Sequence, residues 1–117
     1  MPQPTDALLP LKPADLHILL ALLGEELHGY AIMQRVHDES GGQVELELGS
    51  LYRLIARLTD AGLIAPAAAR FRKAGDDPRR RYYRITPLGR EVAAREARRL
   101  AGVVKLARSL RLLEGTP

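Results

Sequence analysis

Apolar residues recur at helical spacing in several separate stretches of the chain. The stretch PADLHILLALLGEE has leucines at i, i+3, i+4 and i+7, which predicts a helix that ends at Gly24. The stretch HGYAIMQRVHDESGG predicts a second helix that stops at the glycine pair 41–42. The apolar face of GSLYRLIARLTDAGLI predicts a third helix, which Ser50 or Gly49 caps and Gly62 closes.

The first of these helices is apolar on more than one side. We expect four of its leucines to face the core and Ile18 and Leu22 to form a second apolar strip. A small monomer rarely needs a helix that is apolar all round, so this strip is expected to contact a partner. The core-facing leucines are Leu16, Leu19, Leu20 and Leu23.

The pattern between and after these helices alternates with a period of two. The stretch QVELEL predicts a short strand or an extended connection. After Gly62, LIAPAAARFRKAGDDPRRRYYRIT predicts two strands joined by a Gly/Asp/Pro turn. In the second strand, Tyr83 and Ile85 are expected on the core face, and Tyr82 on the opposite face among outward cations.

A long helix is expected to end the chain. Thr86 suits an N-cap and Pro87 suits the first helical position, and the helix that follows could reach about Leu113. The order of helix, helix, extended segment, helix, ribbon and long helix is that of a winged helix-turn-helix with an appended C-terminal helix. The predicted fold class is therefore mainly α (α+β).

Charge is distributed unevenly along the chain. Residues 1–59 carry 4 basic and 8 acidic side chains, residues 60–99 carry 11 and 5, and residues 100–117 carry 3 and 1. Basicity concentrated in one segment suggests an anionic partner. The absence of cysteine excludes disulfides, zinc–thiolate sites and cysteine catalysis, and it suits a cytoplasmic protein.

The third helix has polar and charged side chains away from its apolar face. Arg53 and Arg57 lie four residues apart, and an arginine can bind guanine through two hydrogen bonds or clamp a phosphate. Ser50, at the helix start, and Tyr52 suit phosphate oxygens. These four residues are the expected DNA contacts of the helix, with an ordinary solvated helix face as the alternative.

The predicted ribbon gathers cations that would repel one another if nothing met them. If these cations face DNA phosphates, each contact would release counterions and add affinity. A merely soluble edge is the alternative. The residues expected to reach phosphates or the minor groove are Arg72, Lys73, Arg79, Arg80 and Arg81.

The last helix has an apolar stripe that its own domain cannot cover along its whole length. A dimer is expected, provided that the first helix joins the interface, because association costs about 4–15 kcal/mol. A helix that lies wholly on its own core is the alternative. The expected interface residues are Ile18, Leu22, Ala97, Leu100, Val104, Ala107 and Leu110.

The remaining polar residues are interpreted as structural. Gly29 is expected to permit close packing at the turn into the second helix, and Tyr30 to cover the core. His17, His28 and His37 lack neighbours that would suggest a metal site. With no nucleophile motif, phosphate-binding glycine loop or paired catalytic carboxylates, we expect no enzymatic activity and no cofactor.

Three segments together resemble the PadR family of winged-helix transcriptional regulators, in particular its compact members: LLALLGEELHGYAIMQRV, GSLYRLIARLTDAGLI and DPRRRYYRITPLG. The resemblance runs from about Ala14 to Glu91. It implies a homodimer that binds a near-palindromic DNA operator, usually as a repressor. The third helix would be the recognition helix, the ribbon the wing and the last helix the dimerisation element.

Some members of the family bind phenolic or drug-like compounds between the first and last helices. The sequence departs from the family pattern in two ways. Leu48 stands where a proline is common, and the chain lacks the tryptophan of the best-known drug-binding relative. The missing tryptophan bears on ligand binding and not on DNA binding.

The expected function is that of a homodimeric, sequence-specific DNA-binding repressor, with a small apolar or aromatic effector at the dimer interface. A winged-helix adaptor that binds an acidic protein is the alternative. An RNA-binding module ranks lower because the chain is poor in aromatic residues. The expected divisions are an irregular lead-in at 1–12, a DNA-binding domain at 13–86, and a dimerisation helix and tail at 87–117.

Overall fold

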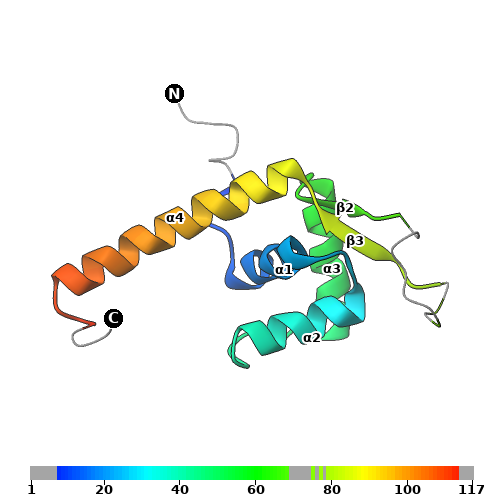
Figure 1. Cartoon of the computed structure of the whole chain (residues 1–117), viewed down its shortest axis with the longest axis horizontal. Coiled ribbons are helices and arrows are strands. Elements are labelled where there is room, and N and C mark those ends of the chain that lie inside the picture. Colours follow the sequence, from blue (N-terminus) through cyan, green and yellow to red (C-terminus); the bar gives the residue numbers. More distant parts are fainter. Residues whose placement is uncertain (1–7, 69–74, 76, 78, 114–117) are drawn as a thin grey trace.

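Four helices and a small sheet make up the structure (Figure 1). This computed structural model describes residues 8–68, 75, 77 and 79–113. The three strands form one antiparallel sheet in the order β1-β3-β2, and the fold is the predicted winged helix-turn-helix with a C-terminal helix. The elements are α1 (Pro13–Gly24), β1 (Leu27–His28), α2 (Gly29–Glu39), α3 (Leu48–Asp60), β2 (Ile64–Pro66), β3 (Tyr82–Ile85) and α4 (Pro87–Ser109).

Local chemistry explains where the helices begin and end. Thr86 caps α4 as predicted, because its Oγ1 accepts a hydrogen bond from the Gly89 amide at 3.0 Å. Gly62 follows α3 with a φ of +79°, a left-handed conformation that favours glycine. The α4 helix ends at Ser109, which is earlier than predicted.

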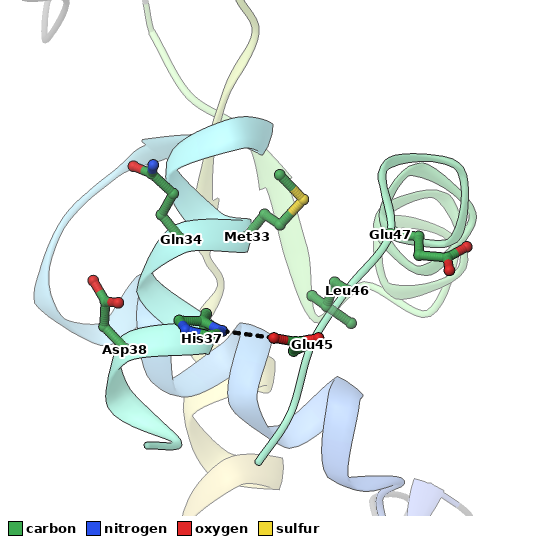
Figure 2. Close-up of a pocket in the computed structure, with 7 residues that line it drawn as sticks. All are labelled: Met33, Gln34, His37, Asp38, Glu45, Leu46 and Glu47. Atoms are coloured by element: carbon green, nitrogen blue, oxygen red, sulfur yellow. Dashed lines mark ion pairs between the residues drawn. The ribbon is translucent and has the colours of Figure 1, made fainter. Parts of the chain in front are cut away.

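The start of α3 corrects the predicted cap. The helix begins at Leu48, and its N-cap is Glu47, whose side chain makes no capping hydrogen bond. Ser50 therefore lies inside the first turn of the helix. The preceding residues form the extended connection and not a strand (Figure 2).

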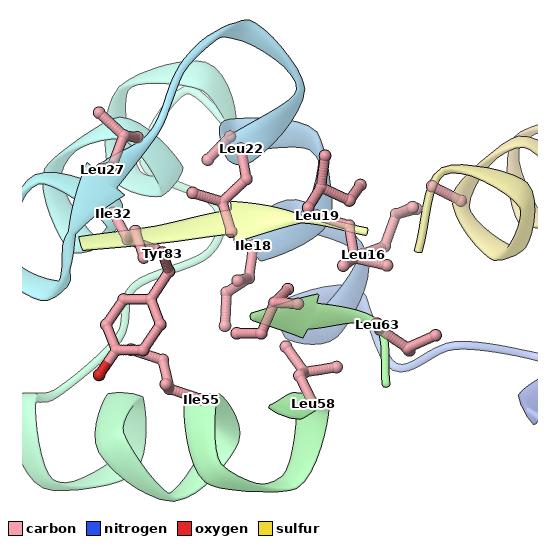
Figure 3. Packing of buried hydrophobic residues seen from close by; sticks show 14 of the residues in the cluster. Leu16, Ile18, Leu19, Leu22, Leu27, Ile32, Ile55, Leu58, Leu63 and Tyr83 are labelled. Atoms are coloured by element: carbon pink, nitrogen blue, oxygen red, sulfur yellow. The ribbon is translucent and has the colours of Figure 1, made fainter. Parts of the chain in front are cut away.

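The apolar core lies where α1 meets α2, α4 and β3. Ile18 and Leu22 belong to this core (Figure 3), with exposed fractions of 0% and 3%. The prediction that they face a partner was wrong, because α1 is central and needs a broad buried face. Leu20 and Leu23, which were expected in the core, are the exposed leucines of α1.

The short strand β1 was not predicted, and it changes the surroundings of β3. Leu27 pairs with Tyr83, and His28 pairs with Tyr82. Tyr82 is consequently buried, with its ring edge-on to the His28 imidazole at 5.3 Å, and it does not lie among outward cations. The predicted core positions of Tyr83 and Ile85 are confirmed.

The described part of the lead-in, residues 8–12, is tied to the body of the chain. Leu8, Leu9 and Leu11 pack against the core, and the Leu11 amide donates a hydrogen bond to Glu96 Oε2 of α4 at 3.0 Å. None of the helices in the described part of the chain has an apolar stretch long enough to span a lipid bilayer.

Candidate nucleic-acid interface

The α3 helix buries one face and presents another. Leu51, Ile55 and Leu58 are buried, which leaves Tyr52 and Arg53 exposed on the outer side. Half of the Tyr52 surface is accessible to solvent. Arg53 Nη2 donates to Ser50 Oγ at 3.1 Å, so these two predicted contacts lie together on the surface of the helix.

Arg57 is engaged within the chain. Its Nη2 donates to both carboxylate oxygens of Asp15, at 2.7 and 2.8 Å. Asp15 is buried, whereas half of the Arg57 side chain is exposed. The pair fastens α3 to the first turn of α1, so the structure gives Arg57 a fastening role that the sequence did not reveal. The partner is 42 residues away, and no local pattern could have identified it.

The arginines that precede β3 are on the surface. Asp77 Oδ1 accepts hydrogen bonds from the Arg79 amide at 2.9 Å and from Arg79 Nε at 3.3 Å, which fixes the turn. Arg80 and Arg81 are also exposed. The predicted contacts Arg72 and Lys73 lie outside the described residues.

A recess with a volume of about 310 Å³ joins α3 to these arginines. Tyr52 reaches it by packing on Gly29, because a Cβ at Gly29 would be 3.1 Å from the Tyr52 hydroxyl. This confirms that Gly29 permits close packing. The recess is lined by His28, Gly29, Tyr30, Tyr52, Asp77, Arg79, Arg80, Arg81 and Tyr83.

Two tyrosines of the recess have different surroundings. Tyr30 was expected to cover the core, but it is 50% exposed, and its hydroxyl accepts a hydrogen bond from Gln34 Nε2 at 3.2 Å. Burial raises the pKa of Tyr83 above the usual 10.0, against the lowering effect of the Arg81 charge. The Tyr83 hydroxyl therefore keeps its proton at neutral pH.

A second recess, of about 470 Å³, lies between α2 and the connection to α3 (Figure 2). His37 Nδ1 faces Glu45 Oε1 at 3.3 Å, and Asp38 and Glu47 add further carboxylates. Its acidic lining opposes binding of a phosphate. Among the described residues, no three His, Cys, Asp or Glu side chains gather as metal ligands would.

The C-terminal half of α4 extends away from the rest of the chain (Figure 1). Of the predicted interface residues here, Ala97, Leu100, Val104 and Leu110 are exposed and Ala107 is half-buried. On α1, which packs against α4, Leu20 and Leu23 are exposed. The other exposed apolar residues of this C-terminal part are Val103, Leu106, Leu112 and Leu113.

Comparison with known proteins places the chain among transcriptional regulators. Residues 18–95 match the model of the transcriptional regulator PadR-like family. An uncharacterized 37.1 kDa protein in a transposon of Streptomyces fradiae is 38% identical over 88 residues. That alignment covers 75% of this chain but only 23% of the relative.

Solved structures of regulators share the fold. A transcriptional regulator from Clostridium thermocellum superposes with a TM-score of 0.66 at 26% identity, covering 82% of this chain and 87% of that one. Bacillus subtilis PadR in complex with operator DNA gives a TM-score of 0.60 at 25% identity. That match covers 73% of this chain and 46% of PadR.

Proposed function

Because the chain belongs to the PadR-like family of transcriptional regulators, we propose that it is a sequence-specific DNA-binding repressor that acts as a cytoplasmic homodimer. The family regulates transcription and is not a family of enzymes, in agreement with the expectation that the chain has no catalytic site. The Bacillus subtilis relative was solved with operator DNA, which supports the same class of partner for this chain.

One observation carries the proposal for DNA. Tyr52, on the exposed face of α3, lines the same recess as the three arginines before β3, so the helix and these cations are neighbours on the surface. A recognition helix in the major groove needs such neighbouring cations, since protein–DNA interfaces make many of their hydrogen bonds to phosphate. Arg53 is the residue proposed to contact a base edge, and Ser50 and Tyr52 are proposed to contact the backbone.

The proposal of a homodimer rests on exposed apolar surface. Leu100 and Val104 of α4 are exposed. On α1, the exposed leucines Leu20 and Leu23 are the residues proposed to join the interface. Ile18 and Leu22 are buried in the core and are no longer proposed there. An apolar surface of this kind on a regulator marks an interaction site. A second copy would pair the α4 helices and hold two α3 helices about one turn of DNA apart, roughly 34–36 Å.

An effector would act by changing the orientation of the two DNA-binding domains of the dimer relative to one another. We assign it to the interface of the proposed dimer, as a small apolar or aromatic compound. The expected result of a calorimetric titration with a broad panel of aromatic compounds is heat from at least one of them. If no compound of the panel gives heat on titration, the proposal of an effector is contradicted, and the DNA-binding proposal is unaffected.

The function is tested by selecting bound sites from a random duplex library and measuring affinity at two salt concentrations. We expect a near-palindromic site, together with affinity that falls steeply as salt rises because phosphate contacts release counterions. If no preferred sequence is recovered and the binding is weak and abolished by salt, the chain binds DNA only through non-specific electrostatic attraction. In that case the adaptor that binds an acidic protein would become the better explanation.

A further inference from the structure

The first turn of α3 presents an apolar side chain to the outside. Leu48 is the first residue of the helix and is 53% exposed. The apolar residues on either side of it differ, because Leu46 is half-buried against the core and Leu51 is buried. Exposed leucines are common on protein surfaces, so the exposure alone assigns no role to Leu48. Its position at the tip of the helix does.

The neighbours of Leu48 leave its side chain prominent at this tip. Gly49 has no side chain, and a Cβ placed there would meet no atom of the described residues within 4 Å. Glu47 is the exposed N-cap, and its side chain makes no capping hydrogen bond to the first turn. Leu48 is therefore the apolar group that the open end of α3 offers to a partner.

Leu48 also lies on the same side of α3 as a residue already proposed to contact DNA. Residues four apart in a helix are neighbours on its surface, which places Leu48 one turn before Tyr52. Tyr52 is 51% exposed and lines the recess beside the arginines that precede β3. The two exposed side chains thus form one strip from the tip of α3 toward the basic surface.

The chemistry of the major groove selects one partner for an apolar side chain at this position. A recognition helix contacts base edges with residues of its N-terminal part. On the major-groove edges, thymine presents its C5-methyl group, whereas the other groups are hydrogen-bond donors and acceptors. A leucine side chain can neither donate nor accept a hydrogen bond, so it gains from the methyl group and leaves the polar groups of the other bases unpaired.

We infer that Leu48 is a specificity-determining residue that reads a thymine in each half-site by packing on its C5-methyl group. The inference rests on the proposed function, because it requires that α3 enter the major groove. It adds a second base-reading residue to Arg53, which would use hydrogen bonds where Leu48 uses an apolar contact. The two residues would specify different positions of one half-site.

The test removes the methyl group alone, by replacing single thymines of the preferred duplex with deoxyuridine. The wild-type protein should bind about fourfold more weakly when one such thymine is replaced, because burial of a methyl group contributes at about this level. Replacement of the symmetric thymine as well should bring the loss to about fifteenfold.

Two variants identify Leu48 as the residue in contact. Leu48→Ala should bind the thymine duplex more weakly by a similar factor, and it should no longer distinguish this duplex from the deoxyuridine duplex. Leu48→Met keeps a long apolar side chain and should retain most of the sensitivity to deoxyuridine. Both variants place a good helix former at an exposed position and should unfold at the same urea concentration as wild type.

The outcomes separate this inference from the proposed function. A library that yields no preferred duplex would overturn the proposed function and the role of Leu48 with it. A preferred half-site without thymine, or one in which deoxyuridine replaces every thymine without loss, would overturn the role of Leu48 alone. Losses from Leu48→Ala and from deoxyuridine that are independent and multiply would overturn it too, because another residue would then contact the methyl group.

Discussion

Arg53 and Arg57 lie one helical turn apart, yet their surroundings differ. Arg53 is on the surface with Ser50, whereas Arg57 holds the buried Asp15 through two hydrogen bonds. A spacing of four residues places both on one side of α3 but does not reveal which of them has an acidic partner on another helix. Sequence alone therefore predicted the basic stripe but not the ion pair between Arg57 and Asp15.

Replacing Arg57 should affect folding. We expect Arg57→Ala to lower the free energy of unfolding by about 1–3 kcal/mol, because it leaves the buried Asp15 carboxylate without this partner. Arg53→Ala is the matched control and should change stability by less than about 0.5 kcal/mol. Urea denaturation of both variants makes the comparison, and equal stability of the two would show that the Asp15 pair contributes nothing.

Glu96 makes stability depend on pH. The side-chain hydrogen bonds from Arg99, at 2.6 and 3.0 Å, hold the pKa of the buried Glu96 below its usual 4.5 against the opposing effect of burial, and the Leu11 amide helps. A carboxyl whose pKa is lowered by folding stabilises the fold above its usual pKa. That contribution is lost as the pH falls through the folded-state pKa.

Glu96→Gln should therefore destabilise the protein most at neutral pH. The difference in unfolding free energy from wild type is expected to shrink as the pH falls below 4.5. Denaturation series at several pH values measure it. A difference that stays constant over this range would contradict the assigned role of the ionised carboxylate.

At the scale of elements, the start of α4 shows how closely the helix packs on the sheet. Gly89 is buried in its first turn, and a Cβ there would overlap the Leu63 carbonyl oxygen and lie 2.8 Å from Ile85 Cγ1. The overlapping atom belongs to the backbone, so the neighbour cannot simply rotate away. Glycine at this position is required by the close approach of α4 to Leu63, just before β2, and to Ile85 of β3.

Two glycines of α4 make a matched pair. Gly89→Ala should lower the free energy of unfolding by about 3 kcal/mol or more, because of overpacking against backbone. Gly102→Ala meets no atom within 4 Å and should raise it by up to about 1 kcal/mol through helix propensity. Thermal unfolding distinguishes them, and a Gly89→Ala protein as stable as wild type would refute the packing argument.

The elements also show what the sequence could predict and why. Long apolar periods and the Thr86–Pro87 start signal predicted all four helices, and the stretch after Gly62 predicted the paired strands β2 and β3. The predicted Gly/Asp/Pro turn between these strands lies mostly outside the described residues. The strand β1 has two residues, too few for a period, and it exists only because β3 pairs with it. This pairing buries Tyr82, which the sequence predicted on the outer face of the strand. It also brings His28 to the recess of the candidate site, which the sequence did not predict.

At the scale of the whole molecule, the exposed part of α4 is the surface on which the proposed dimer depends. The molecule measures 52 × 37 × 24 Å, and the far half of α4 accounts for much of its elongation (Figure 1). A helix that extends in this way with Leu100 and Val104 exposed gains little from its own domain. Pairing with a second copy would bury these side chains, each contributing roughly 1.5–3 kcal/mol before association costs.

A charge on this stripe should break the proposed dimer. We expect Val104→Lys to be monomeric in sedimentation equilibrium at concentrations where the wild type is dimeric, and to bind the operator at least about tenfold more weakly. Ser109→Lys places the same charge at an exposed position on the other side of α4 and should remain dimeric. A wild-type chain that sediments as a monomer would contradict the proposed assembly.

The central claim is that α3 reads DNA sequence through Arg53. The most direct test is site selection from a random duplex library by wild type and Arg53→Ala in parallel. The wild type should recover inverted half-sites about ten base pairs apart. Arg53→Ala should lose the base preference at one position in each half-site and retain the others, since a bidentate arginine contact discriminates by about 1–3 kcal/mol. Recovery of the same site by both proteins, with every preference unchanged, would contradict the account.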